Sequence, residues 1–334
     1  MQTRFEQKIA RIRAGDYQVG DYMIADAKDT EVTGGVPALG MHRDAGGRPV
    51  APRTRAQFID EVRKVIAQDV VDIMLTAAGT MEVLQGARAF AGTGIEPAYR
   101  ANETTCVWGN IRGAAYNAVP SRPYRGANLM LAPANLCLYS ITFVNDVDRD
   151  LRALEAYAAF REEARARGVQ HFLEVFNPNV PDVVAEADMG AFVNDNIIRL
   201  MASLTRAERP AFLKVAYNGP DAMAELCRHD PSMVVGVLGG AGATHRDTFE
   251  LIAQSERHGA RLALFGRKIN QAECQTTLIT WMRRVADRQI SALEAVQGYH
   301  DDLGRAGLSP DRSLAEDVRV TAPVLRFDAT DAGV

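Results

Sequence analysis

Two apolar segments of the sequence each carry one charged side chain where an interior strand residue would stand. Residues 212–218 contain Lys214, and residues 171–177 contain Glu174. Because alternate residues of a strand face the same side, each charge shares a face with the apolar residue two positions before it. A lysine in apolar surroundings loses hydration, which lowers its pKa toward the range in which a neutral amine attacks a carbonyl. The pattern indicates imine (Schiff-base) chemistry on Lys214.

Both charged residues also have a simpler structural explanation. Lys214 could be paired with a carboxylate at a barrel rim, and Glu174 could serve only to neutralise it. If both side chains face the interior of one sheet, Glu174 is instead placed to transfer protons during carbinolamine dehydration and carbon–carbon cleavage. The two interpretations overlap, since an ion pair keeps the lysine protonated until a substrate arrives.

A third candidate, Asp26, stands at the end of the first strand-like segment, residues 22–26. A carboxylate there can accept a hydrogen bond from a substrate hydroxyl and take its proton. It can equally cap the following loop, and the sequence leaves both roles open. Lys28 is a rival for the imine-forming lysine, but it follows the expected strand end, so we expect it to be solvated.

Two glycine-containing segments suggest an anion site. Gly239 and Gly240 follow the seventh strand-like run, and Gly266 with Arg267 follows the eighth. Glycines let backbone N–H groups approach an anion, and an arginine adds a charge-assisted donor. The loops after strands seven and eight are the usual phosphate site of one particular fold, the eight-stranded parallel barrel.

That barrel is also what the arrangement of the elements predicts. Short β-rich apolar runs alternate with amphipathic helical stretches along the chain, which is typical of parallel βαβ units. Eight such runs occur, at residues 22–26, 70–75, 96–101, 136–143, 171–176, 211–216, 234–238 and 262–265. The sequence therefore predicts an α/β fold, a single-domain (β/α)₈ TIM barrel over residues 1–310, followed by a C-terminal tail over 311–334.

The helical stretches fit this barrel. The clearest are residues 148–167 and 244–258, the second opening with Thr244 and Asp247 as a near capping box and stopping at Gly259. We expect a leading helix at residues 1–14 and one long or two shorter closing helices at residues 272–303. Residues 108–135 are rich in Gly, Pro and Asn, and we expect an insertion there, a lid or an oligomer contact.

Composition excludes several classes of function. Lys plus Arg number 38 against 42 Asp plus Glu, so the chain lacks the basic excess that nucleic-acid binding requires. The charged start is unlike a secretory signal, and no apolar run is long enough to span a membrane, so we expect a cytoplasmic protein. The four cysteines and six histidines show no metal-ligand spacing. We expect neither a metal nor a cofactor, and for His245 an exposed position at a helix start.

Four short segments together resemble a known enzyme family. They are Phe172-Leu173-Glu174-Val175, Leu213-Lys214-Val215, Leu238-Gly239-Gly240 and Phe265-Gly266-Arg267. Their order and spacing over residues 135–275 are similar to the class I aldolases of the tagatose-1,6-bisphosphate aldolase and sulfofructosephosphate aldolase group, within the deoxyribose-phosphate aldolase superfamily.

The resemblance implies a role for each matching residue. Lys214 matches the imine-forming lysine, Glu174 the proton-transfer glutamate and Asp26 the first-strand aspartate. The phosphate-binding or sulfonate-binding turns match Gly239, Gly240, Gly266 and Arg267. Asp26-Ala27-Lys28 and Asn177-Pro178 differ from the family pattern, which leaves the lysine chemistry standing but puts the known sugar substrates in doubt.

We therefore expect a metal-independent lyase of carbohydrate metabolism that cleaves or forms a phosphorylated, ketose-like sugar through a Schiff base on Lys214. The same imine could serve a transaldolase or a decarboxylase. A barrel that binds a sugar phosphate without catalysis is a further alternative. The expected partner is a small sugar or sugar phosphate, without nucleic acid or membrane, and we expect a homo-oligomer.

Overall fold

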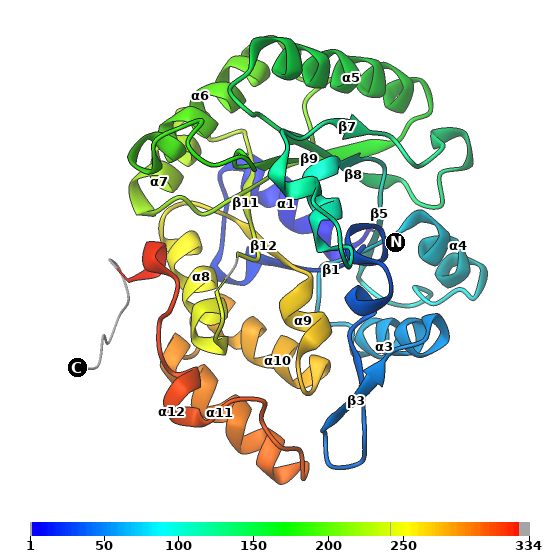
Figure 1. Ribbon diagram of the computed structural model, residues 1–334, viewed down its shortest axis with the longest axis vertical. Helices are drawn as coiled ribbons and strands as arrows, with labels where there is room; N and C mark the ends of the chain where they lie inside the picture. Colours follow the sequence, from blue (N-terminus) through cyan, green and yellow to red (C-terminus); the bar gives the residue numbers. More distant parts are fainter. Residues whose placement is uncertain (1, 241, 327–334) are drawn as a thin grey trace.

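The computed structural model describes residues 2–240 and 242–326, and within these residues eight parallel strands close into a barrel (Figure 1). Around the barrel the order is β1-β12-β11-β10-β9-β8-β5-β4, so neighbours in the chain are neighbours in the sheet. The strands are β1 (Met23–Lys28), β4 (Ile73–Thr76), β5 (Glu96–Arg100), β8 (Leu136–Thr142), β9 (Gln170–Phe176), β10 (Leu213–Val215), β11 (Val235–Leu238) and β12 (Leu262–Phe265). The predicted TIM barrel and all eight of its predicted runs are confirmed.

Helices surround the barrel and cover its outer face (Figure 1). They are α3 (Arg55–Gln68), α4 (Ala78–Gly86), α5 (Val147–Ala166), α6 (Met189–Ala202), α7 (Pro220–His229), α8 (His245–Arg257), α9 (Arg267–Gln271), α10 (Gln275–Ala286) and α11 (Ala292–Arg305). The capping box at Thr244 is present, and the chain after α8 turns at Gly259 with φ +104°. The closing segment forms two helices, α10 and α11.

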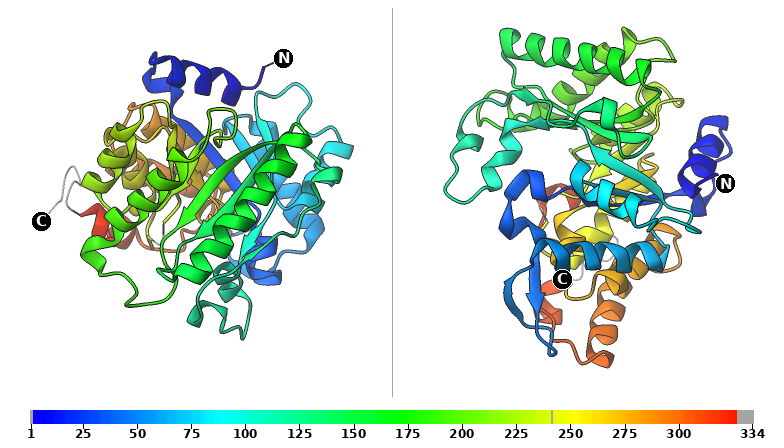
Figure 2. Two further views of the ribbon diagram at one scale, coloured as in Figure 1. Left: turned by 90° about the horizontal axis from the view of Figure 1, so that it is seen from above. Right: turned by 90° about the vertical axis from the view of Figure 1, so that its right-hand side faces the viewer.

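Apolar residues pack in two layers, one inside the barrel and one between the strands and the helices. The inner layer contains alternate strand residues such as Phe172 and Phe212, whose rings stack with centroids 4.4 Å apart. The predicted leading helix, α1 (Arg4–Ala14), adds Phe5, Ile9 and Ile12 to this layer. Figure 2 shows α1 across one end of the barrel, which is the end where the strands begin.

The opposite end of the barrel carries the predicted insertion. Between β5 and β8 the chain forms no α-helix but a short strand pair, β6 (Glu103–Thr104) with β7 (Pro123–Tyr124), and the single turns η3 (Thr105–Asn110), η4 (Tyr116–Ala118) and η5 (Leu129–Leu131). Figure 2 shows this segment projecting away from α1, at the end where the strands finish. A second excursion, the hairpin of β2 (Met41–Arg43) and β3 (Pro49–Pro52), lies between β1 and α3.

The last described residues pack back onto α8. Asp317 at the end of α12 (Leu314–Asp317) is buried and accepts hydrogen bonds from the backbone N and Nδ1 of His245, at 2.8 and 2.6 Å. His245 is 7% exposed, so the expectation of an exposed histidine was wrong. Residues 327–334 of the expected tail lie outside the described residues. No helix in the described ranges has the length and apolar content needed to cross a membrane.

Candidate active site

A cavity of about 630 Å³ opens where the barrel strands end, on the side opposite α1. Its walls include residues from the ends of β5, β9, β10, β11 and β12 and from the loop after β1. In barrels of this type the reactive side chains come from this end of the strands. Lys214 and Glu174 both line the cavity.

Lys214 and Glu174 face each other across neighbouring strands inside the barrel. They are paired in register between β10 and β9, and Lys214 Nζ lies 2.5 Å from Glu174 Oε1. Both side chains are buried, at 7% and 2% exposed. The inner layer of Phe172 and Phe212 lies directly beneath them, because these residues precede the pair by two positions on the same strands. The amine is therefore held at the floor of the cavity, against an apolar layer and beside a carboxylate.

The second oxygen of Glu174 is fixed by two donors from other strands. Ser140 on β8 donates from Oγ to Glu174 Oε2 at 2.6 Å, and Arg100 on β5 donates to the same oxygen from Nη2 at 3.3 Å. Asn102 holds the backbone of Ser140 by donating from Nδ2 to its carbonyl oxygen at 2.8 Å. The carboxylate thus has one oxygen toward Lys214 and the other bound to the barrel wall.

Asp29 completes the charged floor of the cavity. It follows β1 and accepts a hydrogen bond from Arg100 Nε at 2.5 Å. Burial works to raise the pKa of Asp29, but the nearby charges of Arg100 and Lys214 outweigh it and hold the pKa below its ordinary value. Asp29 is therefore a carboxylate near neutral pH, and Arg100 bridges it to Glu174.

Asp26 lies elsewhere than expected. Its side chain faces out of the barrel, in phase with Ile24 of the outer layer, and it does not line the cavity. Lys28 on the same face is fully buried, with Nζ 2.6 Å from Gln275 Oε1 and 3.4 Å from Asp26 Oδ2. Burial raises the pKa of Asp26 to about 6, partly offset by Lys28, and burial lowers the pKa of Lys28. Two expectations are therefore corrected. Asp26 does not face the cavity, and Lys28 is buried and not solvated.

The glycine segments and Arg267 border the far side of the same cavity. Gly239, Gly240, Gly266 and Arg267 all line it. A Cβ on Gly266 would stand 2.7 Å from the backbone oxygen of Ala27, so only glycine allows β12 and β1 to lie this close where their chains leave the barrel.

Two cations that sequence reasoning missed stand beside Arg267. Lys268 lines the cavity, and burial, followed by the charge of Arg312, lowers its pKa to about 8. Arg312 reaches the cavity from the C-terminal segment. Lys268 directly follows Arg267 in the sequence but was given no role, whereas Arg312 lies in the C-terminal segment and is brought to the site only by the fold.

Arg100, Asp29 and Ser140 were also missed, although the sequence held a signal for Arg100. It is a charged residue at the end of an apolar run, two positions after Ala98, which is the pattern that identified Lys214 and Glu174. The insertion also contributes here, since Cys106, Val107 and Asn110 line the cavity.

One group of His and Asp side chains in the described ranges could hold a metal ion, and it lies away from this cavity. His245, His300 and Asp317 place one ligand atom each within 4.8 Å of one another. All three already hydrogen-bond one another through Asp317 Oδ2, which joins α8 and α11 to the C-terminal segment.

Comparison with known proteins gives the fold a clear set of relatives. No protein-family model matches the chain, and no curated protein is similar in sequence. Among solved structures, a Schiff base-forming fructose-1,6-bisphosphate aldolase is 16% identical, with a TM-score of 0.58 over 85% of this chain and 99% of that one. A fructose-bisphosphate aldolase from Slackia heliotrinireducens is 11% identical, with a TM-score of 0.62 over 90% of each chain.

An archaeal fructose-1,6-bisphosphate aldolase, solved with its catalytic lysine covalently bound to a carbinolamine intermediate, gives a TM-score of 0.59. It is 14% identical, over 85% of this chain and 99% of that chain. At these identities the likeness concerns the fold. The chain has the barrel architecture that these Schiff-base aldolases share.

Proposed function

We propose that this chain is a class I aldolase acting on a phosphorylated, ketose-like sugar through an imine on Lys214. The observation that carries the proposal is the inward-facing, buried pair of Lys214 and Glu174 at the floor of a cavity on the carboxyl side of the barrel. The shared barrel of Schiff base-forming aldolases supports it. The finer assignment to the tagatose and sulfofructosephosphate group rests on the resemblance of the short segments alone.

In the proposed reaction Lys214 Nζ attacks the ketone carbon of the substrate. Glu174, 2.5 Å away, takes a proton from the attacking amine and returns it to the carbinolamine hydroxyl, which leaves as water. The resulting protonated imine accepts the electron pair when the carbon–carbon bond between its α and β carbons breaks. A base removes the proton of the β-hydroxyl, an aldehyde departs, and the enamine is reprotonated and hydrolysed.

Two carboxylates of the cavity are available as that base, Glu174 and Asp29. The role first given to Asp26 passes to Asp29, because only Asp29 of the two lines the cavity. Arg100 stands between the two carboxylates and forms an ion pair with each.

The opposite wall supplies the means to hold a substrate anion. Gly239, Gly240, Gly266 and Arg267 would bind a terminal phosphate, with Lys268 close by. Binding energy at this remote end orients the reacting carbon over Lys214.

The test is reductive trapping. The protein is incubated with dihydroxyacetone phosphate and, separately, with a panel of ketose phosphates, then reduced with borohydride and mapped by peptide mass spectrometry. We expect a single adduct on Lys214 that is absent from Lys214→Ala and present in Lys268→Ala.

Lys268 is the control because it also lines the cavity and burial lowers its pKa, so its amine is a competing nucleophile. An adduct on Lys268 or Lys28, or none with any ketone of the panel, contradicts the proposal. Product analysis separates related imine chemistry, since transaldol transfer requires an acceptor sugar and decarboxylation releases carbon dioxide.

A further inference from the structure

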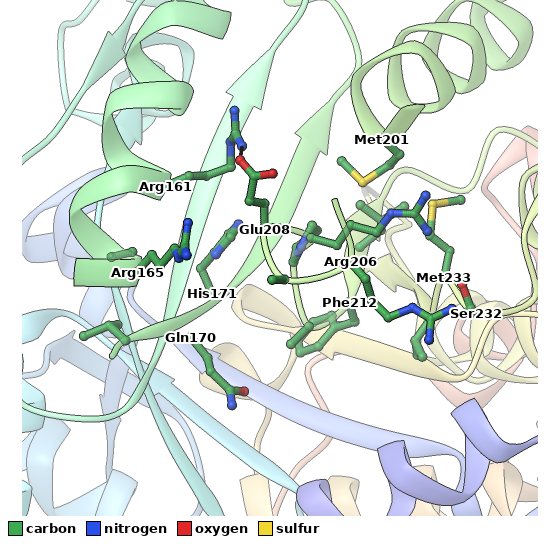
Figure 3. Close-up of a pocket in the computed structure, with 18 of the residues that line it drawn as sticks. Arg161, Arg165, Gln170, His171, Met201, Arg206, Glu208, Phe212, Ser232 and Met233 are labelled. Atoms are coloured by element: carbon green, nitrogen blue, oxygen red, sulfur yellow. Dashed lines mark hydrogen bonds and ion pairs between the residues drawn. The ribbon is translucent and has the colours of Figure 1, made fainter. Parts of the chain in front are cut away.

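A larger cavity, of about 910 Å³, lies at the other face of the barrel. It is formed where β9, β10 and β11 begin, and its walls come from the C-terminal end of α5, the segment before β10 and the end of α1. Figure 3 shows Arg161 and Arg165 entering it from α5, with His171 of β9 between Arg165 and Arg206. Lys214 stands toward the opposite end of the barrel and does not line it.

Arginine dominates the polar lining of this cavity. Two glutamates line the cavity, and five arginines outnumber them. The arginines are Arg13, Arg161, Arg165, Arg206 and Arg209. Arg165 and Arg206 form no ion pair with any residue in the described ranges. The cavity therefore carries a net positive charge that the chain does not neutralise.

Two of the arginines are fixed in position by carboxylates and retain further donors. Arg161 Nη1 donates to Glu208 Oε1 at 3.0 Å, and Arg209 Nη1 donates to Asp230 Oδ2 at 2.7 Å. The Nη2 group of each makes no hydrogen bond to another described residue. Guanidinium groups held in this way present planar donor pairs that match phosphate oxygens and lose little entropy on binding.

The charge of the cavity does not depend on a histidine. His171 is 7% exposed, and its Nε2 lies 2.8 Å from the hydroxyl of Tyr157. Burial, and then the charge of Arg161, lowers the pKa of His171 to about 4, so the ring is neutral at physiological pH. The positive charge comes from arginines, which stay protonated at any pH where the protein is folded.

The lining of the cavity also has an apolar part. Met201, Phe212, Met233 and Val234 contribute to it. A volume of this size falls within the range of small-molecule sites, about 300–1,000 Å³. A lining of apolar side chains and several arginines fits a small organic molecule that bears several negative charges, since its carbon atoms can contact the apolar side chains while its phosphate oxygens bind the guanidinium groups.

We propose that this cavity binds a small molecule carrying two or more phosphate groups, at a site separate from the catalytic cavity. The proposal does not depend on the aldolase reaction, because it rests on the arginines at the N-terminal face of the barrel. It also assigns a ligand to Arg165 and Arg206, two cationic side chains of the lining that form no ion pair with a described residue.

The experiment measures binding of inorganic pyrophosphate by isothermal titration calorimetry at constant ionic strength. The site variant is Arg165→Ala/Arg206→Ala, and the matched control is Arg152→Ala/Arg199→Ala, which removes two exposed arginines outside the cavity from helices α5 and α6. A third protein, Arg267→Ala, reports binding in the catalytic cavity. Thermal melting establishes that all three are folded.

We expect the site variant to bind pyrophosphate at least about tenfold more weakly than wild type, as loss of a charge-assisted hydrogen bond would require. The control should bind as wild type does, and Arg267→Ala should keep the binding event that the site variant loses, whatever it loses in the other cavity. Binding that Arg267→Ala abolishes and the site variant keeps would assign pyrophosphate to the catalytic cavity and overturn the proposal. Equal loss in the site variant and the control would show only general charge attraction, and absence of binding to wild type would also overturn it.

Discussion

Lys214 Nζ and Glu174 Oε1 lie 2.5 Å apart at directly paired positions of β10 and β9. Their separation is set by the spacing of two hydrogen-bonded strands and not by loops. The pair is thus as rigid as the barrel, and Ser140 and Arg100 prevent Glu174 from turning away. A carboxylate held in this way is placed to exchange protons with the lysine amine without a change of its own conformation.

Glu174→Gln removes the proposed proton-transfer group and keeps an oxygen to which Ser140 can donate. We expect kcat to fall about 10²- to 10⁴-fold, the usual contribution of a general acid–base residue. Turnover of the best ketose phosphate from the trapping panel measures this. An unchanged kcat would assign Glu174 a purely structural role.

Asp29 and Asp26 offer a matched comparison, because they lie three residues apart and only Asp29 lines the cavity. Asp29→Asn frees Arg100 to move, and we expect a loss in kcat of about 10²-fold, since small displacements of catalytic groups are this costly. Asp26→Asn should leave kcat unchanged at neutral pH. The reverse order of effects would restore Asp26 to the site.

Asp26 should instead affect stability as a function of pH. Its folded-state pKa is raised from 3.8 to about 6, so the fold favours the protonated form. This group therefore stabilises the wild-type fold fully below pH 3.8. The stabilisation, about 3 kcal/mol in total, is lost as the pH rises from 3.8 through about 6.

The Asp26→Asn variant lacks this titration. Urea unfolding of both proteins between acid and neutral pH should show the stability difference shifting in favour of the variant as pH rises. A difference that is constant with pH would contradict the raised pKa.

Arg267→Ala tests the anion end of the catalytic cavity. Loss of a hydrogen bond to a charged group costs about 1.5–3 kcal/mol, so KM for a ketose phosphate should rise roughly 10- to 100-fold. The rate of borohydride trapping with unphosphorylated dihydroxyacetone should not change, because this ketone has no anion. An equal effect on both ketones would place Arg267 at the reacting carbon.

Asp317→Asn should loosen the C-terminal segment. The carboxylate is buried between His245 and His300, and breaking such a pair costs about 3 kcal/mol. Although burial opposes it, the hydrogen bond from His245 holds the pKa of Asp317 below its ordinary value, so this stability is present above about pH 4 and is lost as pH falls.

Asp311→Asn, which removes a 41% exposed partner of Arg43, is the control and should cost less than about 1 kcal/mol. Thermal melts at neutral and acid pH measure both.

Lys214 and Glu174 could be predicted because each is a single charge between apolar neighbours, and the strand period then gives the face. Asp26 could not be placed in the same way. All six residues of β1 are buried, including the charged Asp26 and Lys28, so burial does not distinguish its two faces. Which face points inward follows from the pairing with β12 and β4. The first-strand segment, which also differs from the family pattern, was thus the one whose orientation the sequence could least predict.

The C-terminal contribution was beyond sequence reasoning for a different reason. Asp317 and His245 are 72 residues apart, at the ends of two helices whose approach depends on the connecting loops, and the paths of loops follow no sequence period. Lys268 and Arg312 likewise enter the cavity from segments outside the strands. Periodicity predicts the elements and their faces, whereas contacts between loops depend on the finished barrel.

Arg312 lines the cavity that contains Lys214, and Asp317 holds the segment that carries Arg312 against α8. During synthesis these residues emerge after all eight strands and after α11, so a nascent chain can close its barrel while the cavity still lacks one wall. A chain cut just after α11 would keep Lys214 and Glu174 but lose a cation from the cavity rim. Proteolysis at the carboxyl end would then weaken substrate capture before it impaired the chemistry itself.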